Sequence, residues 1–330
     1  MTKTITLSQG NGGEENNELI KKIFFEHFGN PTLLKCEDSA IIGSMAVTTD
    51  SFTVKPIFFN GGDIGKLAVC GTCNDLAMMG ARPKYLTCSF IIEEGFSVES
   101  LEKIVLSMKK ELCINGAQII TGDTKVVPKN ALDGIFINTT GIGEVEMQNI
   151  SSNSISTDDL IIVSGDIGRH GACIFAQREG IDIKSALQSD CASLWLVVEE
   201  LIKNDIKITA MRDATRGGLS AVLNEWAKQS NICIEVEEKA VPISKEVQGI
   251  CELLGFEAYN LANEGTFALA VKKEDAQKAL EILKKFEICK NAQIIAKVSN
   301  EYSQKVVLNN EWGSKRFLDM PTGELLPRIC

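Results

Sequence analysis

The stretch FFNGGDIGKLAVCGTCNDLAMMGARP, residues 58–83, contains the pattern that decides the fold. It opens with a glycine-rich turn, NGGDIGK, in which backbone N–H groups, Asp63 and Lys66 lie within a few residues of one another, as a phosphate site requires. The spacing differs from Walker A, which excludes a P-loop. The following IGKLAVCGTCNDLAMMGA has the composition of a buried helix. Its lone CxxC, Cys70 and Cys73, is better explained by core packing than by metal or redox chemistry.

Strands and helices alternate on both sides of this stretch. Two helices are predicted from one-sided apolar stripes, around 14–28 and 97–115, and short β-branched segments bounded by Gly or Asp predict strands within 40–50, 85–94, 117–123 and 133–145. A polar segment, 148–159, then separates this half from a second series of strands and helices. We therefore predict an α/β (α+β) fold with a Gly-rich loop and helix at 1–35, one α/β domain at 36–150, a second at 151–310 and a flexible tail at 311–330.

Composition excludes several classes of protein. The 330 residues are 44% apolar and carry a net charge of −10, which disfavours nucleic acid as a partner because no basic surface is available to neutralise phosphates. No apolar run approaches the roughly 20 residues that span a bilayer, so we expect a cytoplasmic protein without a membrane partner. The 11 cysteines are odd in number, and Cys88, Cys113 and Cys233 lie in apolar segments, which indicates reduced, buried thiols.

Carboxylates recur at the ends of predicted strands or in glycine-containing turns. Carboxylates gathered from strand ends would hold Mg²⁺ for a nucleotide polyphosphate, although aspartate beside glycine also makes turns and helix caps. Six residues share this setting: Asp38, Asp50, Asp63, Asp75, Asp123 and Asp213.

Three further segments favour a site for an anion and for proton transfer. TGDTK (121–125) combines Gly, Asp and Lys, and MRDATRGGL (211–219) adds two arginines before a helix. Glu264, in LANEGTF, precedes an apolar strand and is either a general base with a pKa raised by burial or an exposed turn residue. His27 and His170 are too few and too isolated for a histidine-based site.

The sequence ends in ELLPRIC, which places a thiol, Cys330, on the last residue. A thiol on a mobile arm can visit several sites in turn as a carrier of a bound group. An arm formed by residues 319–330 reaches about 40 Å when fully extended at roughly 3.3 Å per residue.

Taken together, these stretches resemble the HypE family, the carbamoyl dehydratases that make the cyanide ligands of nickel–iron hydrogenase. The matching pieces are residues 58–83, TGDTKVV, DGIFINTTGIG, MRDATRGGL, LANEGTF and LPRIC. The resemblance implies a two-domain fold shared with aminoimidazole ribonucleotide synthetase, in which two N-terminal domains pair into a β-barrel in a homodimer. Departures are Gln9 where His is expected, Ala214 where Pro is usual, and Cys73 where an aliphatic residue is typical.

The resemblance also implies a reaction. The carbamoyltransferase HypF loads a carbamoyl group on Cys330, ATP with Mg²⁺ drives its dehydration to a thiocyanate, and the cyano group passes to iron on a HypC–HypD complex. Glu264 would accept a proton and Lys125 would stabilise the transferred phosphate. The nucleotide would contact Lys66, Asn74, Asp50, Asp75, Asp123 and Asp213, and the metal ligands would be Asp38, Asp50, Asp75 and Asp123.

Two rival interpretations remain. One is another ATP-dependent enzyme of the same superfamily, a selenophosphate synthetase or a thiamine-monophosphate kinase. SQGNGGEEN lacks the Cys and Lys that the synthetase requires, and a kinase has no use for a terminal PRIC. The other is a non-catalytic thiol carrier, in which ATP only switches the tail between docked and exposed states.

Overall fold

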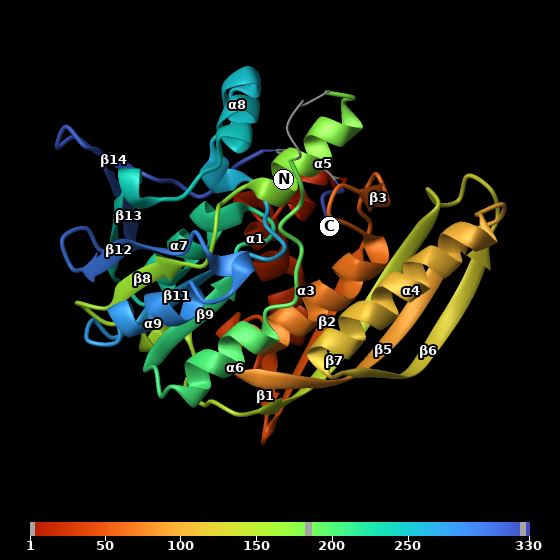
Figure 1. The fold of residues 1–330 in the computed structure, drawn as a ribbon, viewed down its shortest axis with the longest axis horizontal. Coiled ribbons are helices and arrows are strands. Elements are labelled where there is room, and N and C mark those ends of the chain that lie inside the picture. Colours follow the sequence, from red (N-terminus) through yellow and green to blue (C-terminus); the bar gives the residue numbers. More distant parts are fainter. Residues whose placement is uncertain (1–3, 182–186, 324–327) are drawn as a thin grey trace.

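The computed structural model describes residues 4–181, 187–323 and 328–330, which form two sheets with helices around and between them (Figure 1). The first sheet has the strand order β1-β2-β7-β5-β6, in which only β5 and β6 run parallel. Its strands are β1 (Ala40–Ile42), β2 (Met45–Phe52), β5 (Ala81–Glu93), β6 (Gln118–Val127) and β7 (Ile135–Val145). The short pair β3 (Phe58–Phe59) and β4 (Gly62–Asp63) forms a separate two-stranded sheet.

Helix α3 (Ile64–Met78) follows the glycine-rich turn and lies between the two halves of the molecule. It begins at Asp63, whose Oδ1 accepts hydrogen bonds from the N–H groups of Gly65 (2.7 Å) and Lys66 (3.1 Å). Asp63 is therefore a helix cap, the alternative that the sequence had left open. Because α3 contacts β2, β5 and β7 on one side and β9 and α6 on the other, 13 of its 15 residues are buried, Cys70 and Cys73 among them.

Helix α4 (Val98–Asn115) packs along α3 in front of the first sheet (Figure 1). Ser97 caps its first turn, and Gly116, at φ +66°, ends it in the left-handed conformation that glycine adopts without strain. Cys113, predicted to be buried, is exposed on this helix. The prediction was wrong because α4 has one face in solvent, and its apolar residues are not all on the inner face.

The second sheet is mixed, with the order β14-β13-β10-β12-β8-β11-β9, and only β10 and β13 run parallel. Strand β11, between β8 and β9, is buried along its whole length. The strands are β8 (Leu160–Val163), β9 (Ile208–Asp213), β10 (Cys233–Glu237), β11 (Phe267–Val271), β12 (Gln293–Ser299), β13 (Lys305–Asn309) and β14 (Lys315–Phe317); the helices are α5 (Arg169–Arg178), α6 (Trp195–Lys203), α7 (Gly218–Gln229), α8 (Lys245–Leu254) and α9 (Ala276–Leu283).

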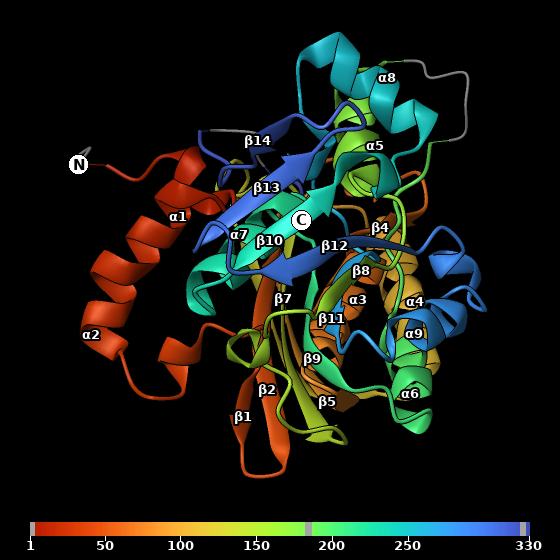
Figure 2. The same ribbon diagram turned by 90° about the vertical axis from the view of Figure 1, so that its left-hand side faces the viewer.

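The N-terminal helix stands apart from both sheets (Figure 2). It runs as α1 (Glu14–Leu19), a π-helical segment (Ile20–Phe25) and α2 (Glu26–Phe28). The helix was predicted from its apolar stripe, but Ile23, Phe24 and Phe28 remain 47%, 45% and 67% exposed. The stripe thus identifies the helix correctly without indicating a core contact within the described chain.

The first sheet is open, with β1 and β6 at its edges, and within the described residues it closes no barrel. The barrel predicted for a dimer therefore stays a prediction, as do the domain boundaries at 35, 150 and 310. Strand β14 lies in the segment assigned to the tail, because residues 315–317 pair with β13. No described helix is long and apolar enough to cross a membrane, and the cytoplasmic location stays a prediction.

Candidate active site

A cavity of about 320 Å³ lies where the two sheets meet, and carboxylates line it. Asp50 comes from β2, Asp75 from α3, and Asp213 from the end of β9. The sequence had separated them by up to 163 positions, and the fold brings them to one wall. The cavity is also lined by Asp38, Thr48, Arg212, Arg216, Glu264 and Cys330.

These carboxyl groups disfavour one another's ionisation. Burial first, and then the charges of Asp50, Asp213 and Asp38, raise the pKa of Asp75 well above its usual value, against a hydrogen bond of 2.7 Å from Thr48 Oγ1. Burial and the neighbouring aspartates raise the pKa of Asp213 in the same way. Burial also raises the pKa of Asp50, although Arg216 opposes the shift. Such a cluster favours a bound cation, because the cation would relieve this mutual repulsion.

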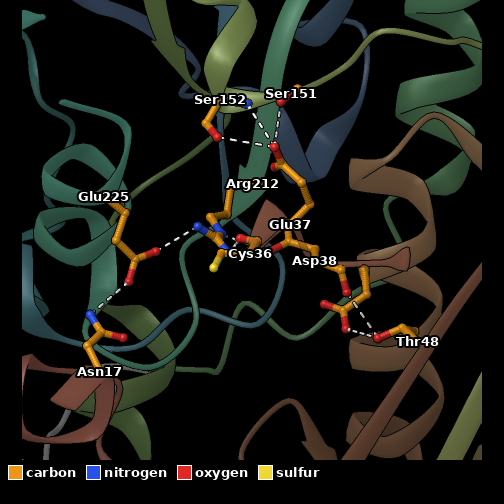
Figure 3. A network of polar contacts seen from close by, with 10 residues as sticks. Asn17, Cys36, Glu37, Asp38, Thr48, Ser151, Ser152, Arg212 and Glu225 are labelled. Atoms are coloured by element: carbon orange, nitrogen blue, oxygen red, sulfur yellow. Dashed lines mark hydrogen bonds and ion pairs between the residues drawn. The ribbon is translucent and has the colours of Figure 1, made fainter. Parts of the chain in front are cut away.

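Arg212 lies at the edge of the cavity and links the chain segments around it (Figure 3). Its guanidinium donates to Asp38 Oδ1 (2.7 Å), Glu225 Oε2 (2.6 Å) and the carbonyl of Cys36 (3.0 Å), which joins the segment before β1 to β9 and α7. Burial raises the pKa of Asp38 to about 6 even with Arg212 opposing. Asp38 Oδ2 is buried without a hydrogen-bond partner, so one carboxylate oxygen is held by Arg212 and the other remains available.

Glu264 lines the same cavity as Cys330 and lies in the loop that leads into β11. The loop is held by Asp190, whose two carboxylate oxygens accept from the N–H groups of Glu264 and Gly265, each at 3.1 Å. Glu264 is 2% exposed, and its Oε1 has no partner. Burial, followed by the charges of Asp213, Asp190 and Asp50, raises its pKa well above the usual value. Of the two alternatives from the sequence, the exposed turn residue is excluded, and the role of general base stays a prediction.

Cys330 lies in this cleft, and a second cavity of about 210 Å³ adjoins it. Its backbone oxygen accepts hydrogen bonds from Thr53 N–H (2.8 Å) and Thr53 Oγ1 (3.1 Å). Burial raises the pKa of the thiol to about 12, although Arg216 opposes the shift. Cys330 in turn is the main cause that raises the pKa of Arg216. The structure therefore places the thiol beside one cation and several carboxyl groups.

The glycine-rich loop 10–13 packs against the same cleft. Gly12, at φ +73°, lies so close to Arg216 that an added Cβ would come within 2.7 Å of its carbonyl oxygen, which only glycine tolerates. Gln9, which replaces the expected His, accepts from Thr6 N–H at 2.9 Å and does not line the carboxylate cavity.

Four predicted residues are not brought to the carboxylate cavity. Lys66 Nζ donates to the Gly61 carbonyl (3.0 Å). Asn74 is buried, and its side chain bonds the backbone of Ala192, Leu194 and Glu264. Asp123 and Lys125 are exposed on β6 and pair with each other at 2.9 Å. Because β7 and β5 separate β6 from β2, Asp123 lies about 14 Å from the Asp50 strand, at roughly 4.8 Å per strand.

Sequence reasoning missed the groups that hold the end of the chain. His170, set aside as isolated, is fully buried and contacts the carbonyl of Ile329 (2.7 Å). Asp133 and Arg178 contact Arg328. Only the rarity of histidine in the sequence hinted at His170, because its partner lies 159 positions away.

The carboxylates suit a divalent cation in charge but do not yet form a complete set of ligands. Within the described chain, no three His, Cys, Asp or Glu side chains converge on one point. The unpartnered oxygens of Asp38 and Glu264 and the raised pKa values around them fit a cation whose remaining ligands are phosphate oxygens and water.

Two family models together match most of the chain. Residues 36–145 match the model of the AIR synthase related protein N-terminal domain, and residues 156–309 match that of the C-terminal domain. The carbamoyl dehydratase HypE of Escherichia coli K12 is 42% identical, over 99% of both chains. The chain belongs to the HypE family.

Two solved HypE structures share the fold. A HypE in complex with ATP is 44% identical, with a TM-score of 0.84 over 99% of this chain and 100% of that one. The HypE chain of a HypE–HypF complex is 44% identical, with a TM-score of 0.89 over 92% and 99% of the two chains. The HypE family resemblance read from the sequence, and the two-domain fold that it implied, are therefore confirmed.

Proposed function

We propose that this chain dehydrates an S-carbamoyl group on Cys330 to a thiocyanate, with ATP as the second substrate, during maturation of nickel–iron hydrogenase. The observation that carries the proposal is the position of Cys330, whose thiol lies among Arg216, Glu264, Asp50 and Asp213 in one cleft. A group carried on this sulfur would meet a cation and a proton acceptor together. That arrangement favours the dehydratase over a passive thiol carrier.

The reaction balances in two steps. The carbamoyl oxygen of R–S–C(=O)–NH₂ attacks the γ-phosphorus of ATP and the N–H group loses one proton, which gives ADP and R–S–C(=NH)–O–phosphate. The C–O bond then breaks as the second N–H proton leaves, which yields R–S–C≡N and phosphate. Phosphorylation thus converts a poor leaving group into a good one.

Glu264 is the proposed acceptor of these protons. Its raised pKa makes the carboxylate a stronger base than an exposed glutamate, and its unpartnered Oε1 is available to a group on Cys330. Arg216 would stabilise negative charge that develops on the carbamoyl oxygen, because a guanidinium stays protonated.

ATP and Mg²⁺ would occupy the carboxylate cavity. We propose Asp38, Asp50 and Asp75 as metal ligands, with Asp213 close to the nucleotide. When bound, Mg²⁺ neutralises phosphate charge and orients the γ-phosphoryl group. Contacts from Lys66 and Asn74 to nucleotide remain part of the proposal, although Asn74 is engaged with the backbone of 192, 194 and 264.

Asp123 and Lys125 would need a second copy of the chain. Both lie on the exposed edge strand β6, where Ile119, Ile120 and Val126 are 40%, 54% and 68% exposed. An unpaired edge bearing apolar side chains is a surface that commonly pairs with another chain. We therefore propose a homodimer built through the first sheet, in which Asp123 joins the metal and nucleotide ligands and Lys125 stabilises the transferred phosphate.

The partners proposed from the family are HypF and the HypC–HypD complex. HypF would load the carbamoyl group, and iron on HypC–HypD would receive the cyano group. A HypE 44% identical to this chain has been solved with HypF, which supports the first of these partners.

Intact-protein mass spectrometry tests the function. After incubation with carbamoyl phosphate, HypF and ATP, the carbamoylated chain should lose the mass of one water, and one ATP should be hydrolysed per water lost. Glu264→Gln should retain the carbamoyl mass and slow the water loss by about a hundredfold or more, the usual scale for a general base. Cys113→Ser, an exposed thiol, is the control that should behave as wild type. ATP hydrolysis by Cys330→Ala at the carbamoylated wild-type rate would falsify the proposal.

A further inference from the structure

The last residues of the chain lie antiparallel to the segment that follows β2 and are hydrogen-bonded to its backbone. Thr53 N–H donates to the backbone oxygen of Cys330 (2.8 Å), and Lys55 N–H donates to the carbonyl of Arg328 (3.2 Å). The two bonds are two residues apart on each segment, and the segments run antiparallel. Arg328 has a φ of +52°, so the tail is not extended there, and the two bonds hold it against residues 53–55 without forming a regular strand pair.

Arg328 is recognised by three different interactions. Its Nε donates to the Thr53 carbonyl (2.8 Å), its Nη1 donates to Asp133 Oδ2 (2.6 Å), and the guanidinium lies over the ring of Phe136 at 5.4 Å. A planar, fork-shaped cation is needed to make all three at once, and lysine offers neither the fork nor the stacking plane. The contacts therefore select arginine at this position.

Ile329 is held through both its side chain and its carbonyl. The residue is 5% exposed and packs in the main hydrophobic core. Its carbonyl contacts His170 Nε2 (2.7 Å), while Nδ1 lies 2.8 Å from Ser189 Oγ. Because a carbonyl can only accept, Nε2 carries the proton of the imidazole and donates it here. Burial lowers the pKa of His170 and favours this neutral form.

All of these contacts are made by residues 328–330. The site on the body consists of Thr53, Lys55, Asp133, Phe136, His170 and Arg178, which donates to the Arg328 carbonyl at 2.9 Å. We call this set the tail-end site. Each residue of the site contacts a side chain or a backbone group of residues 328–330. The same contacts can therefore form whether these three residues belong to the same chain or to a separate peptide.

We propose that the tail-end site is a peptide-binding site that recognises the sequence Arg-Ile-Cys in trans, on a separate peptide as well as on the chain's own tail. The inference deepens the proposed function, because the same site presents the sulfur to Glu264 and Arg216. Binding itself needs neither ATP nor a carbamoyl group. Its test therefore fails or succeeds independently of the dehydratase proposal.

The test is a fluorescence-anisotropy titration with a labelled synthetic peptide, Glu-Leu-Leu-Pro-Arg-Ile-Cys, under reducing conditions. The receptor is the full-length chain carrying Arg328→Ala with Ile329→Gly, which weakens docking of its own tail. We expect saturable binding to this variant and at least about tenfold weaker binding to wild type, because a tethered tail competes at high effective concentration. A peptide with Ala in place of Arg should bind at least about tenfold more weakly, as expected for loss of a charged hydrogen bond.

Two variants locate the binding. In the receptor, Asp133→Asn should weaken peptide binding by about tenfold. Asp319→Asn, at another exposed aspartate, should leave the affinity for the peptide unchanged. Equal binding by wild type and receptor, or equal binding of the Arg and Ala peptides, would overturn the proposal.

A second measurement covers a receptor that does not fold. In the otherwise wild-type chain, Asp133→Asn should accelerate alkylation of Cys330 relative to Asp319→Asn, as read by peptide mass mapping. Unchanged alkylation would count against a tail-end site that selects arginine.

Discussion

At the scale of single residues, the reactivity of Cys330 depends on where its sulfur lies. Burial raises the pKa of this thiol to about 12, against an ordinary value of 9.0, so at neutral pH the docked sulfur is almost entirely protonated. Thiolate is the nucleophile in alkylation, and three pKa units correspond to about a thousandfold less thiolate. The docked position thus protects the sulfur until the tail leaves it.

This predicts slow labelling of Cys330 in the resting chain. Iodoacetamide at pH 7.5 should alkylate Cys330 at least about tenfold more slowly than the exposed Cys113 of the same molecule. The labelling of Cys330 that remains comes from brief undocking of the tail. Quantitative mass mapping of the two peptides measures the ratio. Equal rates in the native chain would mean that the thiol is not held in the cleft, and labelling in denaturant provides the reference in which the difference should vanish.

At the scale of elements, strand β6 is the part of the first sheet least explained by the single chain. All of its residues are exposed except Val127, which is half-buried, although strands of this composition usually cover a core. It also carries Asp123 and Lys125, two residues with proposed roles and no neighbour from the cleft. Both facts have one explanation if a second copy covers the strand.

A charged side chain introduced on β6 should therefore dissociate the proposed dimer. Ile120→Lys, at a position 54% exposed, should convert the dimer to a monomer in sedimentation and light-scattering measurements, because it buries a charge only in the paired state. The thermal midpoint of the monomer should change little. Leu106→Lys, on α4 and 58% exposed, is the matched control that should remain dimeric; dissociation by both variants, or by neither, would argue against pairing through β6.

At the scale of the whole molecule, the cleft concentrates negative charge that the fold alone does not neutralise. The pKa values of Asp75, Asp213 and Glu264 are raised well above their usual range, so these groups bind protons more tightly in the folded chain than in the unfolded one. Stability from such groups is lost as pH rises from the usual carboxyl pKa, about 4, through the raised values. The free energy of unfolding of the unliganded chain should then fall between pH 5.5 and 8.

Magnesium should reverse this loss. At about a hundred times its dissociation constant, Mg²⁺ should add roughly 2.7 kcal/mol to the free energy of unfolding at pH 8 and raise the thermal midpoint by a few degrees. The rise should be clearly smaller at pH 5.5, because protons compete with Mg²⁺ for the carboxylates. Differential scanning fluorimetry at matched ionic strength measures both shifts. Asp75→Asn should lose most of the gain at pH 8, and a gain that is the same at both pH values would indicate a site elsewhere.

The fold was largely predictable because its signals are local. Asp63 before an apolar helix, Gly116 at the end of another, and short β-branched strands each specify structure within a few residues. Of the six aspartates predicted from their local setting, four line one cavity: Asp38, Asp50, Asp75 and Asp213. Asp63 caps α3 instead, and Asp123 is exposed on β6. Helix α5 was missed, and His170 with it, because the helix is only ten residues long and its buried face includes Gly171 and His170, which weaken an apolar pattern.

Long-range relations could not be read from the sequence. Nothing near Asp133 or His170 indicates that they hold residues 328 and 329, which lie 195 and 159 positions away. The separation of Asp123 from the other aspartates was equally hidden, because strand order, unlike strand identity, depends on how the whole sheet assembles. Asn74 joins loops of the second sheet for reasons of packing, and no spacing in its own segment reveals that role.

The main-chain pairing of residues 328–330 has a consequence for turnover. Its hydrogen bonds involve backbone carbonyls and the arginine, and none of them uses the sulfur of Cys330. The tail would thus dock with nearly the same affinity whether Cys330 is a free thiol, carbamoylated or cyanylated. Docking of this kind cannot distinguish a tail that carries a group on Cys330 from one that has lost it. The timing of tail release must therefore depend on what else is bound in the cleft.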